Sequence, residues 1–294
     1  MNYLQIVIRS MTVFVLPALA ACFYALGSMG LKRSMQNGAA ARRVMAVSNI
    51  AMALWSVPLI FVFPGTWHLN AWFMAIGAGV ALFCGRIFSI KALEAGDLSI
   101  VAPLLGMKTV LVAVLSMVFF PFEVTRTLIF SAVLASVGVA LLQRGPVERK
   151  AGTKKAALYA MGASFLFAIT DISVQGARDL LGVGYLVPTL FLTVGLLVPL
   201  LGRHPAPPPK ACQSMYAGSV VIGFQTMLMI LVIGLIGQAT LVNVIYSSRA
   251  LWSVVVDRAM GEPHIKDYLF SRMAGALFVM GAVVMAIVSK LNAS

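Results

Sequence analysis

The sequence predicts an all-α membrane protein with ten transmembrane helices, arranged as two inverted five-helix repeats. Three observations predict this fold: the composition, ten long apolar segments, and a similarity between the two halves of the chain. Of the 294 residues, 61% are hydrophobic and only 11% are charged, and the mean hydropathy is +0.96. A soluble domain has about 25% charged residues to face water. The composition therefore excludes a soluble domain, a disordered chain, a secreted disulfide scaffold and a coiled coil, and it indicates that most of the chain lies in lipid.

A helix that crosses the hydrocarbon core of a membrane needs about 20 mostly apolar residues. Ten segments meet or approach this requirement, and no polar segment between them is long enough to form a separate domain. The predicted spans, first to tenth, are Met11–Leu31, Val44–Phe63, Trp72–Ile90, Leu98–Phe120, Leu128–Leu142, Ala156–Val174, Val183–Leu201, Met215–Ile236, Ala239–Met260 and Leu269–Ser289. The fifth is short, and the break between the eighth and the ninth rests only on Gly234, Gly237 and Gln238.

The net charge of +13 does not indicate a nucleic-acid partner, because the basic residues lie in short loops between apolar segments. The loops after the odd-numbered spans carry thirteen of them: Lys32, Arg33, Arg42, Arg43, Lys91, Arg144, Arg149, Lys150, Lys154, Lys155, Arg203, Lys210 and Lys266. The opposite side carries four: Arg9, Arg126, Arg178 and Lys290. The positive-inside rule then predicts a multi-pass protein of the inner (plasma) membrane, with the basic loops in the cytoplasm and both termini outside.

A basic linker at residues 143–155 divides the chain into a first repeat, residues 1–142, and a second repeat, residues 156–294. Phe23–Ser28 in the first span aligns with Leu166–Asp171 in the sixth, and Gly96–Val101 before the fourth aligns with Gly237–Val242 before the ninth. Because five is an odd number, the second repeat enters the membrane from the opposite side. Inverted repeats of this kind are typical of secondary transporters, whose substrate sites lie near the midplane of the bilayer.

The 5+5 arrangement, with Lys91–Pro103 leading into the fourth span and Ala259–Pro263 after the ninth, resembles the drug/metabolite transporter superfamily and its EamA-type members in particular. This resemblance implies transport across a membrane. Members of that family usually have both termini in the cytoplasm and a basic loop after the second helix. The corresponding segment here, Pro64–Ala71, has no charge, so the orientation follows the charge bias of this chain.

Ionisable residues inside the predicted spans are the candidates for function: Arg86, Lys108, Asp171, Arg249 and Asp257. Each costs about 2.5–3.5 kcal/mol at the centre of a bilayer, so such residues face the interior of the bundle and have a partner or a ligand. The alignment that pairs Gly96 with Gly237 also pairs Lys108 with Arg249, which predicts two cations around one pseudo-two-fold axis.

Helical spacing places Tyr246, Trp252 and Ser253 on the same face as Arg249. A guanidinium, a hydroxyl and aromatic walls suit an organic anion bound through a carboxylate or phosphate. Basic residues on the fourth and ninth helices also resemble those of the sugar-phosphate and phosphate translocators. We therefore expect Lys108, Arg249, Tyr246, Trp252, Ser253 and Arg86 to bind the substrate.

Alternative interpretations of these residues remain open. Lys108 could extend its amine to the interface, Arg249 could pair with Asp171 or Asp257, and Arg86 could reach the headgroups from near the end of its span. Asp171 is interpreted either as a proton- or cation-coupling site or as the counter-charge of Arg86 or Arg249. If Lys108 has no acidic partner, Lys108→Gln is expected to leave the protein folded.

The predicted function is secondary transport, by alternating access, of a small organic anion that is phosphorylated or carboxylated. The alternative is an exporter of amino acids or of neutral or cationic drugs, and a more distant one is an intramembrane enzyme or a flippase subunit. No catalytic, metal or cofactor motif is present in the sequence, so no enzymatic activity and no cofactor are predicted. The expected partners are the anion and membrane lipids; the small residues Ala132, Ser136 and Ala140 also allow close helix packing, including a homodimer.

Overall fold

The structure, a computed structural model, describes residues 3–96, 98–121, 124–143, 152–202, 205–259 and 268–291. Within these ranges the regular secondary structure is helical throughout. Residues 144–151 of the predicted linker and residues 260–263 of the second family-like motif lie outside the described ranges.

The helices follow the predicted spans in order. The first half of the chain contains α1 (Tyr3–Gln36), α2 (Ala41–Ser56) with the short α3 (Leu59–Val62), α4 (Leu69–Ala95), α5 (Leu98–Gly106) with α6 (Lys108–Phe119), and α7 (Arg126–Leu142). The second contains α8 (Thr153–Leu181), α9 (Val183–Leu196) with the 3₁₀ turn η2 (Val198–Leu201), α10 (Pro209–Ile236), α11 (Ala239–Tyr246) with α12 (Arg249–Ala259), and α13 (Leu269–Leu291).

These helices confirm the prediction of a multi-pass helical membrane protein. Nine stretches in the described part of the chain are long and apolar enough to cross a membrane, and the fifth span, Arg126–Leu142, is apolar but shorter. Some helices begin or end several residues away from the predicted ends of their spans. Thr153, Lys154 and Lys155, which the sequence analysis placed in the linker, form the first turn of α8, because lysine is a good helix former.

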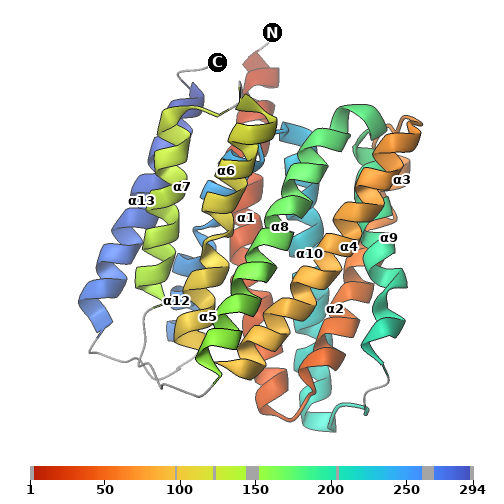
Figure 1. The fold of residues 1–294 in the computed structure, drawn as a ribbon, viewed down its shortest axis with the longest axis vertical. Coiled ribbons are helices and arrows are strands. Elements are labelled where there is room, and N and C mark those ends of the chain that lie inside the picture. The colour runs from red at the N-terminus through yellow and green to blue at the C-terminus, as the bar shows by residue number, and fades with distance from the viewer. Residues whose placement is uncertain are drawn as a thin grey trace.

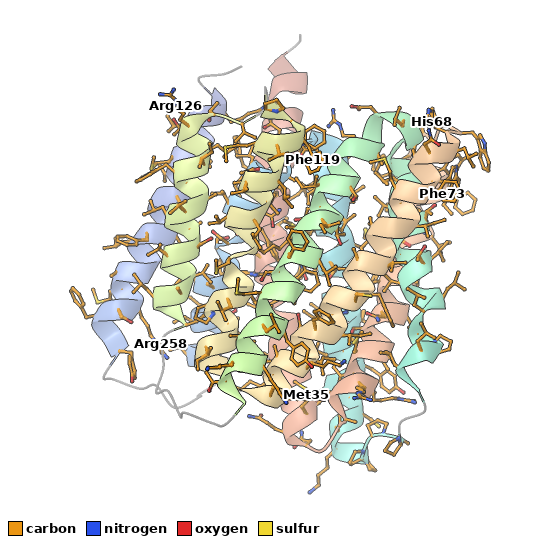
Figure 2. All side chains as sticks on the ribbon, in the orientation of Figure 1. Met35, His68, Phe73, Phe119, Arg126 and Arg258 are labelled. Atoms are coloured by element: carbon orange, nitrogen blue, oxygen red, sulfur yellow. The ribbon has the colours of Figure 1, made fainter. Side chains whose placement is uncertain are left out.

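The helices form one bundle, with both chain ends at the same end of it (Figure 1). We call this the terminal end; His68, Phe119 and Arg126 lie there, whereas Met35 and Arg258 lie at the opposite end (Figure 2). Helices α2, α8 and α10 all begin at this opposite end (Figure 1), which we call the basic end because Arg42, Lys154 and Lys210 belong to their first turns.

Three long helix pairs build the bundle: α4 packs along α8, α1 along α10, and α7 along α13. Glycines let the backbones approach closely in the second of these pairs. A Cβ atom added to Gly30 would lie 2.9 Å from the Cα atom of Gly218, and one added to Gly218 would lie 2.8 Å from the backbone nitrogen of Leu31. Neither position has room for a side chain.

Gly218→Ala is therefore expected to destabilise the protein by about 1–3 kcal/mol, the usual cost of overpacking a tight contact. Gly77→Ala is the matched control, because nothing lies within 4 Å of a Cβ atom at that position of α4. Alanine is the better helix former, so this variant should be as stable as the parent or more so. Thermal unfolding of the detergent-purified variants measures the difference, and an equal loss in both would contradict the packing argument.

Small residues on the fifth span contact other helices of the same chain. Ala132 is fully buried in an apolar cluster with residues of α6, α11 and α13, and the Ser136 hydroxyl donates to the Gly106 carbonyl oxygen at 3.2 Å. These two residues therefore offer no separate support for a homodimer, which stays a prediction.

The fourth and ninth spans are both interrupted near their middle. Met107 separates α5 from α6, and Ser247 and Ser248 separate α11 from α12. Backbone bonds tighten there to a three-residue spacing, from Met107 N to Leu104 O at 3.2 Å and from Ser248 N to Ile245 O at 3.1 Å. As a result, Lys108 and Arg249 are each the first residue of the second helical segment of their span.

Candidate functional site

Arg249 is held between two tyrosine rings. Its Cζ atom lies 4.9 Å from the ring centroid of Tyr24 on α1 and 4.8 Å from that of Tyr246 on α11. Both distances are within the range of a cation–π interaction. The residue as a whole is partly buried, and in the described part of the chain its guanidinium forms no ion pair with a carboxylate.

The two tyrosines are themselves fixed. Their rings meet edge to face with centroids 6.1 Å apart, and the buried hydroxyl of Tyr246 accepts a hydrogen bond of 2.8 Å from Gln225 Nε2 on α10. Aromatic pairs prefer this geometry, so the rings form a rigid support for the guanidinium. Tyr246 therefore lies where the sequence predicts it, against Arg249.

The other residues predicted around Arg249 have different surroundings. The Ser253 hydroxyl donates to the backbone oxygen of Arg249 at 2.9 Å, a local helical bond, and the Trp252 side chain is 40% exposed. The second ring at the guanidinium is that of Tyr24, which the sequence analysis noted only as part of the repeat motif. Helical spacing on one span could not identify it, because Tyr24 comes from another helix.

Lys108, the other predicted cation of the site, is neutralised. Its Nζ atom lies 2.7 Å from Asp171 Oδ2 on α8, and the same oxygen accepts a 2.6 Å hydrogen bond from Asn243 Nδ2 on α11. Asp171 is only 1% exposed. The counter-charge interpretation assigned Asp171 to Arg86 or Arg249; its partner in the structure is Lys108, because α6 packs against α8 whereas α12 packs against α1.

Further hydrogen bonds hold α11 beside this ion pair. The Gln175 Oε1 atom on α8 accepts a 2.9 Å bond from the backbone nitrogen of Ala239, so it satisfies an otherwise unpaired group at the start of α11. The hydroxyls of Thr240 and Ser116 lie 2.9 Å apart and join α11 to α6. The ion pair is thus part of a polar seam between α6, α8 and α11.

Arg86 is an interior residue and does not lie at a helix end. Helix α4 continues to Ala95, five residues beyond the predicted end of the third span, so Arg86 is nine residues from the end of its helix. Its Nη2 atom donates to the Ser48 hydroxyl on α2, and its Nε atom is buried without a hydrogen-bond partner.

Two arginines, Arg86 and Arg249, therefore lie inside the bundle without a carboxylate partner among the described residues, and Arg249 also contacts the Tyr24 ring. Asp257 was considered as a partner of Arg249, but its side chain lies outside what the structure describes. In the described residues, no group of three His, Cys, Asp or Glu side chains is arranged to hold a metal ion. A guanidinium matches a carboxylate or phosphate, so these two arginines are candidates for binding an anion.

No family model and no curated protein matches the chain. A solved structure described only as "Crystal structure of protein" is similar in fold, with a TM-score of 0.76 and 12% sequence identity over 93% of this chain and 97% of that chain. At this identity the similarity shows the fold alone. The bundle is therefore one that another protein of nearly the same extent also adopts.

Proposed function

We propose that this protein is a secondary transporter that moves a small organic anion across a membrane by alternating access. The observation that supports this most directly is the pair of arginines, Arg249 and Arg86, inside membrane spans without a carboxylate partner in the described residues. Each such cation costs about 2.5–3.5 kcal/mol, and a bound anion offsets that cost. A guanidinium binds a carboxylate or phosphate through two parallel hydrogen bonds, so both groups are candidate ligands.

The packing pattern supports an inverted repeat. The third span packs along the sixth (α4 with α8), and the equivalent pair in the other half, the eighth with the first, also packs together (α10 with α1). Both the fourth and the ninth spans are interrupted directly before their cation. Interrupted helices at the midplane are typical of transporters built from inverted repeats. On this basis, and on the family-like motifs, we propose membership of the drug/metabolite transporter superfamily.

In this mechanism the anion binds to Arg249 against the fixed tyrosine pair, and the two halves move around the bound ligand. Asp171 neutralises Lys108, so of the two cations that the repeat alignment matches, Arg249 is the one that remains to attract the substrate. The interrupted points at Met107 and Ser247–Ser248 are the positions where backbone bonding is least regular, and we propose that the spans bend there during the exchange of access.

The orientation is tested with reporter fusions. We propose that the basic end faces the cytoplasm of the inner membrane, because Arg42, Lys154 and Lys210 belong to helix starts at that end. Alkaline phosphatase fused after Ser294 should then be active, and a fluorescent protein there should stay dark. Insertion of the same reporters at Ala206, between α9 and α10, should give the reverse. A bright fluorescent fusion after Ser294 would contradict the proposed sidedness.

The proposed substrate class is tested by a ligand panel. Sugar phosphates, nucleotides, dicarboxylates, amino acids and cationic drugs are each added to purified protein, and its thermal unfolding is recorded. A ligand at 100 times its Kd stabilises the native state by about 2.7 kcal/mol. We expect such a shift from at least one anion class, whereas stabilisation by cationic or neutral compounds alone would favour the alternative drug-exporter function.

A further inference from the structure

Several buried polar atoms in the described residues have no hydrogen-bond partner, among them atoms of Asn49, Ser219 and Arg86. Asn49 on α2 is 0% exposed, and neither its amide nitrogen nor its amide oxygen has a partner. Ser219 on α10 is also 0% exposed, and its hydroxyl has no partner. The third group is the Nε atom of Arg86 on α4. Unpaired buried polar groups are uncommon in native proteins, so a cluster of them needs an explanation.

These groups lie in one layer of the bundle. Arg86 Nη2 donates to Ser48, the residue before Asn49. Helices α2 and α10 both start at the basic end, where Asn37 Nδ2 donates to the Lys210 carbonyl oxygen at 3.4 Å (Figure 1). Gly223 contacts Ala51 and Met52 on α2. Helices α2 and α10 run in the same direction, and Ser48 and Ser219 each lie about one turn before these contacting residues. The two serines therefore lie at the same level of the bundle.

This layer lies at a defined distance from the tyrosine pair. Gln225 on α10 donates to the Tyr246 hydroxyl and so marks the level of the Arg249 site. Ser219 is six residues earlier on the same helix, which places it about 9 Å nearer the basic end at 1.5 Å per residue. That separation is close to the length of a six-carbon metabolite. Arg86, which donates to Ser48, contacts α2 at the level of Ser219.

We propose that Asn49 and Ser219, beside Arg86, form a second subsite that recognises a neutral hydrogen-bonding group, a hydroxyl or an amide, at the far end of the transported anion. The proposal rests on the proposed function, since the acidic end of the same molecule binds Arg249. An asparagine amide offers a donor and an acceptor side by side. A hydroxyl or amide group of the substrate satisfies both, whereas an apolar tail leaves both unpaired and is rejected for that reason.

The test uses anions that have the same charged group and differ at the far end. Gluconate is compared with hexanoate, and glucose 6-phosphate with cyclohexylmethyl phosphate, by thermal shift and equilibrium binding on the full-length protein in detergent. Wild-type protein should bind the hydroxylated member of at least one pair at least about tenfold more tightly. Asn49→Leu should remove this preference and leave the affinity for the apolar member within about twofold, because leucine has a similar volume and no polar atom.

Ser219→Ala should remove part of the preference for the hydroxylated anion. If Asn49→Leu does not fold, the ratio of the two affinities measured in Ser219→Ala decides whether the subsite exists. Ser56→Ala is the matched control: Ser56 is also fully buried on α2, but its hydroxyl already donates to Ala53 O at 2.7 Å, and the preference should not change.

Equal binding of both members of each pair by the wild type would overturn the subsite and leave the proposed function standing. An equal loss of both members in Asn49→Leu would also overturn it, because the residue would then be structural. If none of the four anions binds, the subsite is rejected, and if no anion of the wider ligand panel binds either, the proposed function is rejected as well.

Discussion

Arg249→Lys is expected to weaken anion binding about 10- to 100-fold, although the variant keeps the positive charge. The guanidinium is planar and contacts the rings of Tyr24 and Tyr246, and its fork of donors matches a carboxylate or phosphate. An ammonium group is a point charge and cannot make the same two parallel bonds. Losing one hydrogen bond to a charged group costs about 1.5–3 kcal/mol, which corresponds to the expected change in affinity.

Equilibrium binding and substrate counterflow in proteoliposomes measure this effect. Tyr24→Phe keeps the ring that stacks on the guanidinium and should change the affinity little. Arg42→Lys, an exposed arginine at the start of α2, is the control for the same chemical change outside the site. Unchanged affinity for every anion in Arg249→Lys would show that the substrate binds elsewhere.

Lys108→Gln is expected to destabilise the protein by about 3–5 kcal/mol, the usual cost of breaking a buried ion pair by removing one partner. The sequence analysis expected this substitution to be tolerated, because it assigned Lys108 no acidic partner. The structure pairs it with Asp171, which is 1% exposed and would keep its charge with only Asn243 as a donor. Asp171→Asn should be destabilising for the same reason, since it leaves the lysine unpaired.

The double variant Lys108→Gln/Asp171→Asn should recover most of the lost stability, because it removes both charges together. A double-mutant cycle on the unfolding free energy gives the coupling between the two residues directly. Additive losses, with no recovery in the double variant, would contradict a structural ion pair. If Asp171 instead couples transport to protons, Asp171→Asn should abolish gradient-driven uptake and leave exchange of substrate for substrate intact.

The sequence by itself determined the spans. In lipid every backbone polar group must be bonded within the protein, so a long apolar segment has no spanning alternative to a helix, and composition and length are sufficient to find it. Even the short fifth span, Arg126–Leu142 in the structure, is visible in the sequence. Span ends such as Thr153–Lys155 were less exact, because a helix can continue with polar residues once it leaves the apolar layer.

Only the tertiary structure decided which charges are paired. Lys108 and Arg249 match in the repeat and each opens the second segment of its span, yet their surroundings differ. Helix α6 packs against α8, which supplies Asp171 to Lys108, whereas α12 packs against α1, which supplies the ring of Tyr24 to Arg249. A linear sequence shows that a charge lies at membrane depth, but its partner comes from a neighbouring helix, and side-chain packing between helices selects that neighbour.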